Sequence, residues 1–122
     1  MILTKVIQAI EPLQVIGNTG NLQLLHIHHL LVDSRQLDRE AVNTLFFAFQ
    51  TKQNNGAIYI PALIEKGVRC FVIEQFNPEL PKLAKLLNNP ENPVFIVVNN
   101  TLSALQQLAI YKRSLYKGPV IA

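Results

Sequence analysis

Short runs of apolar residues alternate along the chain with polar segments that are rich in Asn, Gly and Pro. These runs do not alternate between apolar and polar positions, and the last of them is β-branched or aromatic throughout. Runs of this kind are typical of strands that are covered on both faces of a sheet. The predicted strands are residues 28–33, 45–49, 69–74 and 94–98.

Between these strands, apolar residues recur at intervals of three and four positions, as they do on one face of a helix. The predicted helices are residues 4–10, 58–66, 77–87 and a long helix that Asn100 or Thr101 caps and Gly118 ends. The positions of the long helix that are expected to face the core are Leu102, Leu105, Leu108, Ala109 and Leu115. Residues 14–24, rich in Gly and Asn, predict a turn or tight hairpin, and residues 120–122 predict the start of another strand.

The regular alternation of strands and helices predicts an α/β fold, a three-layer sandwich around a mostly parallel sheet. The chain has 122 residues, so we expect one domain over residues 1–122. Its hydrophobic content of 49% excludes a disordered tail, and its single cysteine excludes a disulfide framework.

The net charge of +3 comes from eleven Lys and Arg residues against eight Asp and Glu residues. The basic residues are scattered, and the densest group, Lys112, Arg113 and Lys117, complements the dipole of the last helix. We therefore expect no nucleic-acid partner. No apolar run is long enough to cross a bilayer, and Lys5 interrupts the first apolar segment, which therefore does not resemble a secretory signal. We expect no membrane partner and a cytoplasmic location.

Few residues suggest catalysis. His26 and His28 would share one side of a strand and could bind a metal, but exposed imidazoles are the simpler interpretation, and we expect no metal site. Cys70 lies in an apolar strand, where a thiol usually serves packing. The sequence contains no phosphate-binding P-loop, dinucleotide fingerprint or nucleophile elbow, so we expect no catalytic residue.

Two polar segments follow directly after predicted strands and are the main candidates for a binding site. Ligands of open α/β sheets bind at the carboxyl ends of the strands, and this inventory of hydroxyl, amide and cationic groups suits an anionic small molecule. Ordinary solvated loops are the alternative, with Asp33 as a cap for the following turn. The candidate residues are Asp33, Ser34, Arg35, Thr51, Lys52, Gln53, Asn54, Asn55 and Gly56.

An ordered series of motifs resembles the amino-terminal domain of the Mur ligases, the ATP-dependent amide ligases that build the peptidoglycan stem peptide. The resemblance covers about residues 25–122. The motifs are VDSR at 32–35, TLFFA at 44–48, NG at 55–56, IEKGV at 64–68 and NNTLSALQQLA at 99–109. Within the family, the sequence is most similar to members that add D-alanyl-D-alanine to UDP-N-acetylmuramoyl-tripeptide, including versions fused to an alanine racemase.

This resemblance implies a division of labour. The first domain would bind the UDP end of the UDP-N-acetylmuramoyl-peptide and would pack against a central domain of the same chain, which holds ATP and magnesium. The chain would then stop just before the central domain's P-loop, would need no cofactor of its own and would not be catalytic alone. Pyridoxal phosphate would be needed only if a racemase domain follows. The alternative is a stand-alone α/β interaction module that binds no nucleotide.

Carried over residue by residue, the resemblance places Ser34 against the uridine, with Asp33 and Arg35 shaping the turn. Residues 51–54 fall on the loop that approaches the uracil and the diphosphate, where Lys52 offers a charge and Gln53 an amide. Three positions depart from the family pattern. Thr51 replaces a Gly, and Asn55 and Ala57 replace the Asp and His of a DGH motif.

Overall fold

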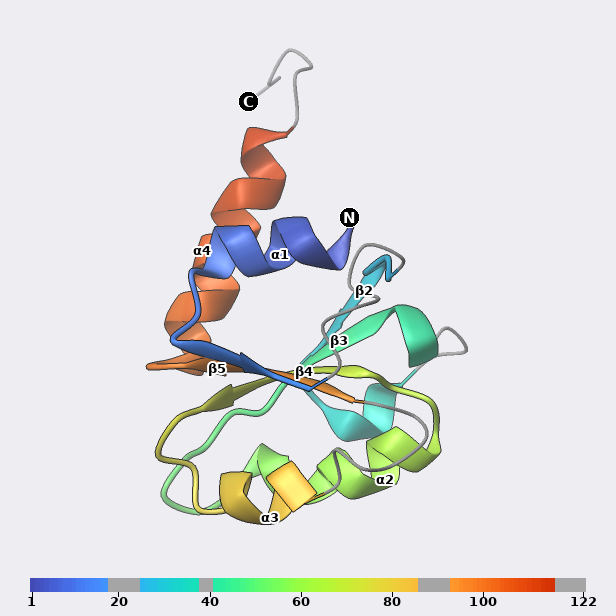
Figure 1. Ribbon diagram of the computed structural model, residues 1–122, viewed down its shortest axis with the longest axis vertical. Coiled ribbons are helices and arrows are strands. Elements are labelled where there is room, and N and C mark those ends of the chain that lie inside the picture. Colours follow the sequence, from blue (N-terminus) through green and yellow to red (C-terminus); the bar gives the residue numbers. More distant parts are fainter. Residues whose placement is uncertain (18–24, 38–40, 86–92, 116–122) are drawn as a thin grey trace.

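The computed structural model describes residues 1–17, 25–37, 41–85 and 93–115, and in it a five-stranded sheet separates two layers of helices (Figure 1). The strand order is β1-β5-β4-β3-β2, and every neighbouring pair is parallel except β1 and β5. The fold is therefore the predicted α/β sandwich with a mostly parallel sheet. The strands are β1 (Gln14–Ile16), β2 (His29–Leu31), β3 (Thr44–Phe47), β4 (Cys70–Glu74) and β5 (Val94–Val98).

Helices α1 (Leu3–Ile10) and α4 (Thr101–Ser114) cover one face of the sheet, and α2 (Ile60–Glu65) and α3 (Leu80–Ala84) cover the other (Figure 1). All four were predicted from the sequence, with small shifts at their ends. The segment before α2 begins as a 3₁₀ turn (Gly56–Tyr59), and residues 86–87 of the predicted third helix lie outside the described residues. The strand expected at residues 120–122 also lies outside them.

The prediction of a turn or hairpin at residues 14–24 is wrong for its first part. Residues 14–16 form the edge strand β1, which pairs antiparallel with β5, and residues 18–24 lie outside the described part of the chain. Three residues are too few to show a strand pattern of apolar and polar positions in the sequence. The segment is a strand because its backbone pairs with β5. Gly17 follows at φ +125°, and a Cβ there would come within 2.4 Å of the Pro93 carbonyl oxygen. Only glycine fits this turn.

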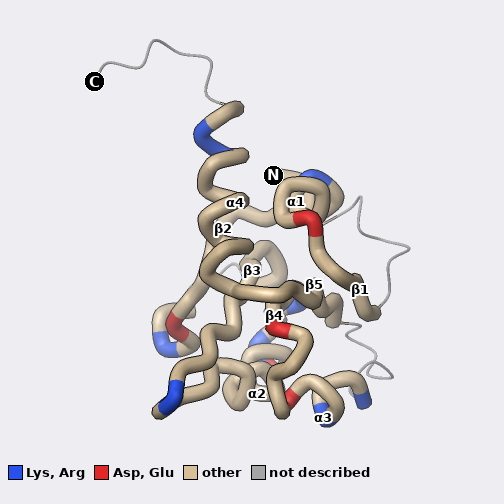
Figure 2. The backbone as a smooth tube through the Cα atoms, turned by 90° about the vertical axis from the view of Figure 1, so that its left-hand side faces the viewer, with Lys and Arg blue, Asp and Glu red and all other residues tan. Residues whose placement is uncertain are grey.

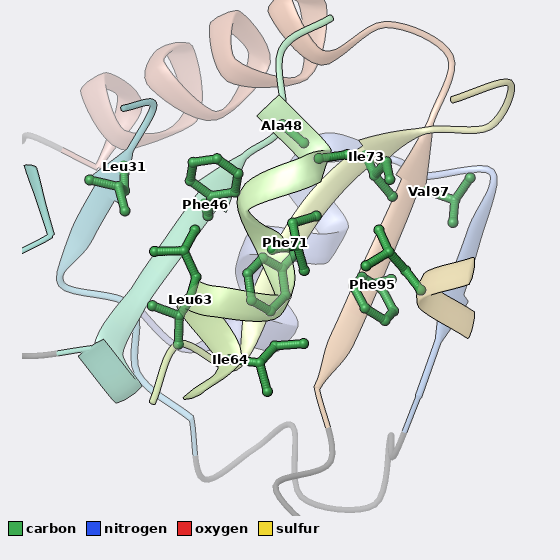
Figure 3. Close-up of a cluster of buried hydrophobic side chains, with 13 residues drawn as sticks. Leu31, Phe46, Ala48, Leu63, Ile64, Phe71, Ile73, Phe95 and Val97 are labelled. Carbon is green, nitrogen blue, oxygen red and sulfur yellow. The ribbon is translucent and has the colours of Figure 1, made fainter. Parts of the chain in front are cut away.

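The interior is built from the two faces of the central strands, and adjacent residues of a strand point to opposite layers. Phe46, Phe71 and Phe95 lie in register on β3, β4 and β5, fully buried on the face toward α2 (Figure 3). The ring centroid of Phe71 lies 6.3 Å from that of Phe46 and 5.6 Å from that of Phe95. Cys70 is fully buried on the other face, and this burial raises the pKa of its thiol to about 12. The interpretation of Cys70 as a packing residue is confirmed.

The core-facing side of α4 differs from the prediction. Thr101, Ala104 and Leu108 are buried against the sheet and α1, whereas Leu102 is 52% exposed. Among the other expected positions, Leu105 is half-buried, and Ala109 and Leu115 are exposed. The prediction is confirmed for Leu108 and wrong for Leu102, Ala109 and Leu115, because the buried face of the helix runs through Thr101, Ala104 and Leu108. Asn100 caps the helix, since its side-chain oxygen accepts a hydrogen bond from the Ser103 N–H at 2.9 Å.

The positions of Lys, Arg, Asp and Glu residues are spread over several elements of the described structure (Figure 2). Within the described residues, no helix has the length and apolar character needed to span a membrane.

Candidate functional site

The carboxyl ends of β2 and β3 lead into two polar segments that line one hollow of about 430 Å³. The two strands are adjacent and parallel, so the segments that follow them emerge at the same edge of the sheet. The hollow is lined by Val32, Asp33, Ser34, Arg35, Phe46, Phe49, Thr51, Asn54, Gly56 and Tyr59.

The first segment is a 3₁₀ turn (Ser34–Gln36) that Asp33 caps. The Asp33 carboxylate accepts hydrogen bonds from the Arg35 backbone N–H at 3.0 Å and from Arg35 Nε at 3.1 Å and Nη2 at 2.9 Å. These bonds lower the pKa of Asp33 below its ordinary value. The Arg35 side chain is 87% exposed, so solvent screens the ion pair and its contribution to stability is small. The pair does shape the turn, which carries Ser34 at the hollow.

The second segment, residues 50–56, is a closed loop. The Thr51 N–H donates to the Asn54 carbonyl at 2.7 Å, and the Asn54 N–H donates to Thr51 Oγ1 at 3.1 Å. At its base, the Gly56 N–H donates to the Phe49 carbonyl at 2.8 Å. A Cβ on Gly56 would lie 3.2 Å from that carbonyl oxygen, closer than side chains usually approach backbone. The glycine therefore lets the loop return tightly onto the end of β3.

Asn55 attaches this loop to the turn that follows β4. Its Nδ2 donates to Asn77 Oδ1 at 2.8 Å, and Asn77 Nδ2 donates back to Asn55 Oδ1 at 2.9 Å. Asn55 Oδ1 also accepts from the Ala57 N–H at 3.0 Å, which caps the 3₁₀ turn before α2. Asn77 itself is only 2% exposed.

The structure brings together six of the nine candidate residues, which line the hollow: Asp33, Ser34, Arg35, Thr51, Asn54 and Gly56. Lys52 and Gln53 are exposed in the loop and do not line the hollow as it stands, and Asn55 faces Asn77 instead. Whether any of the nine binds a ligand stays a prediction.

Four lining residues were missed because they are apolar: Val32, Phe46, Phe49 and Tyr59. Sequence reasoning assigned the first three to strands, yet their place at strand ends is a usable signal. Phe46 is buried, Phe49 is half-buried, and Tyr59 is 41% exposed. Together they give the hollow an aromatic wall beside its polar groups, an arrangement common in small-molecule sites.

None of the three histidines lines this hollow. The ring centroids of His26 and His28 are 6.3 Å apart, and those of His28 and His29 are 6.5 Å apart. Across residues 1–17, 25–37, 41–85 and 93–115, no three His, Cys, Asp or Glu side chains are grouped so that they could hold a metal ion.

The sequence is similar to known enzymes, although no family model matches the chain. Over 102 residues it is 28% identical to the UDP-N-acetylmuramoyl-tripeptide–D-alanyl-D-alanine ligase of Borreliella burgdorferi, covering 83% of the chain and 21% of that enzyme. Over 80 residues it is 34% identical to the UDP-N-acetylmuramoyl-L-alanyl-D-glutamate–2,6-diaminopimelate ligase of Bacteroides fragilis, covering 66% and 15%. The homologues of this chain are Mur ligases.

The fold agrees with this relationship. Two crystal structures of MurF from Acinetobacter baumannii superpose on the chain with TM-scores of 0.66 and 0.65, at 17% and 18% identity. The matched regions cover 94% and 93% of this chain but only 21% of each MurF chain. The chain thus spans about a fifth, or less, of the length of the curated relatives that it matches.

The three departures from the Mur ligase pattern each have a local structural role. The Thr51 hydroxyl closes the loop through Asn54, and the Asn55 side chain keeps the cap on Ala57. Ala57 is fully buried, so an imidazole at this position would displace core side chains. The loop here is stabilised by contacts that its own residues make.

Proposed function

We propose that this chain is the substrate-recognition domain of an ATP-dependent peptidoglycan-precursor ligase and binds the UDP end of UDP-N-acetylmuramoyl-tripeptide. One observation carries the proposal: in a homologue of Mur ligases, the DSR turn and the loop after β3 line the same hollow. The hollow lies at the carboxyl edge of a mostly parallel sheet, where open α/β sheets bind ligands.

The groups around the hollow match the parts of a nucleoside diphosphate. Phe49 and Tyr59 offer aromatic surface to a nucleobase, and Ser34 offers a hydroxyl to the uridine. In the loop, Gln53 can pair with the uracil edge and Lys52 can attract the diphosphate. Both side chains are exposed and lie in the loop that contributes Thr51 and Asn54 to the hollow.

The parent enzyme that we propose uses ATP and magnesium, held in a central domain against which this domain packs. It would form an acyl phosphate on the substrate carboxylate and then an amide with D-alanyl-D-alanine, in the cytoplasm. The relative that aligns with 83% of the chain carries the name of this step. An alanine racemase domain with pyridoxal phosphate stays a prediction. This domain would position the substrate and make no bond.

A titration of the ¹⁵N-labelled chain with UDP tests the proposal. We expect amide shifts at Ser34 and residues 51–56, with unchanged signals on α4, on the far side of the sheet. Ser34→Ala should weaken binding, and Ser103→Ala, an exposed serine of α4, is the matched control. No shift around residues 33–35 and 51–56 at millimolar UDP would refute nucleotide binding and would favour the interaction module.

A further inference from the structure

A reciprocal amide pair joins two segments that are far apart in the sequence. The side chains of Asn55 and Asn77 each donate one hydrogen bond to the other, at 2.8 Å and 2.9 Å. Asn77 is 2% exposed, so its amide is withdrawn from water and depends on these partners. Buried polar groups of this kind are costly when a partner is removed.

Backbone donors fix the orientation of both amides. The Ala57 N–H donates to Asn55 Oδ1, and the Glu79 N–H donates to Asn77 Oδ1, both at 3.0 Å. Each side-chain oxygen therefore accepts two hydrogen bonds, and a flip of either amide would place NH₂ against an N–H donor. The pair has one arrangement.

The pair acts on the loop that lines the hollow. Asn55 stands between Asn54 and Gly56, which both line it, whereas Asn77 follows β4 and does not. The base of the loop is attached to the segment just after β3 by the Gly56–Phe49 hydrogen bond. Asn77 holds the same loop from the turn after β4, so the loop has two separate attachments.

We propose that Asn77 is a positioning residue for ligand binding, which acts through Asn55 to hold residues 51–56 in the conformation that lines the hollow. The inference rests on the proposed function, because UDP is the ligand whose binding it controls. Asn77 itself makes no contact with the ligand.

Asn77→Ala tests the inference in the whole chain. We expect about tenfold weaker UDP binding, since the variant loses the two hydrogen bonds that link Asn77 to the loop, besides the one from the Glu79 N–H, and each is worth several-fold in an equilibrium constant. Gln75→Ala is the matched control, because it removes the Gln75–Asn99 hydrogen bond of 3.0 Å from the same turn without touching the loop. The control should bind UDP within about twofold of the wild-type chain. Circular dichroism measures the folded fraction of each variant, and each UDP affinity is calculated from the concentration of folded protein.

A double-mutant cycle separates positioning from general destabilisation. Because Asn77 acts through Asn55, adding Asn77→Ala to Asn55→Ala should not weaken UDP binding further. Fully additive losses would contradict the inference, because they would mean that Asn77 acts by another route.

Measurements on the free protein keep this inference separate from the proposed function. Asn77→Ala should shift the amide resonances of residues 51–57 and speed hydrogen exchange at the Gly56 N–H, while Gln75→Ala should not. If the wild-type chain binds no UDP, the proposed function fails, and these signals alone decide whether Asn77 positions the loop. If UDP binds equally well to the wild type and to Asn77→Ala, or if the loop signals do not move, the inference is overturned.

Discussion

Phe71→Ala tests the account of the core most directly, because Phe71 is the middle ring of the aromatic row across β3, β4 and β5. The side chain is fully buried, and its ring lies 6.3 Å from that of Phe46 and 5.6 Å from that of Phe95. Truncation to Ala removes the transfer free energy of the ring and leaves a cavity. Together these cost about 3–5 kcal/mol. A domain of this size has a free energy of unfolding of about 5–15 kcal/mol, so the loss is a large part of its stability.

Urea unfolding followed by circular dichroism measures this loss. With a slope of about 2 kcal/mol/M in urea, the midpoint should fall by roughly 1.5–2.5 M. The slope itself should not change, because the surface exposed on unfolding barely changes. Phe71→Leu, which keeps much of the apolar volume, should cost about 1–2 kcal/mol and serves if the Ala variant does not fold. Phe76→Ala is the matched control, since this ring is 86% exposed and should cost less than about 0.5 kcal/mol. Equal midpoints for Phe71→Ala and Phe76→Ala would refute this description of the core.

Three further predictions follow from single contacts. Gly17→Ala should lower the free energy of unfolding by about 2–4 kcal/mol, because a Cβ would meet the Pro93 carbonyl in a left-handed backbone; an unchanged thermal midpoint would contradict this. The pKa of Asp33, followed by carboxyl NMR, should lie below its ordinary value and rise in Arg35→Ala. Its contribution to stability is then present above the unfolded-state pKa and is lost as the pH falls through the folded-state pKa. Cys70, with its pKa raised to about 12, should resist a thiol reagent until the chain unfolds, and rapid modification of the native chain would show that it is accessible.

The core and the hollow share part of the same sheet. Phe46 is buried against its neighbours and also forms part of the wall of the hollow. The polar groups that line the hollow lie in two segments that are closed by their own hydrogen bonds. Binding of the proposed ligand to such preformed segments would cost little conformational entropy.

The sequence by itself determined the central strands, the order of strands and helices, and the two polar segments after β2 and β3. These features could be predicted because continuous apolar runs, helix caps and turn residues are local signals, which do not depend on what the segment contacts in the folded protein. Even the likeness to Mur ligases was readable in this way, since the motifs follow one another along the sequence.

Only the tertiary structure decided the rest. Residues 14–16 form a strand because they pair with the edge of β5, and α4 buries Ala104 and Leu108 against the sheet and α1. Thr51 and Asn54 of the loop line the hollow, whereas Lys52 does not. Asn55 forms hydrogen bonds with Asn77, which lies twenty-two positions further along the chain. These outcomes depend on which surfaces meet in three dimensions, and neither residue type nor spacing along the chain encodes such a meeting.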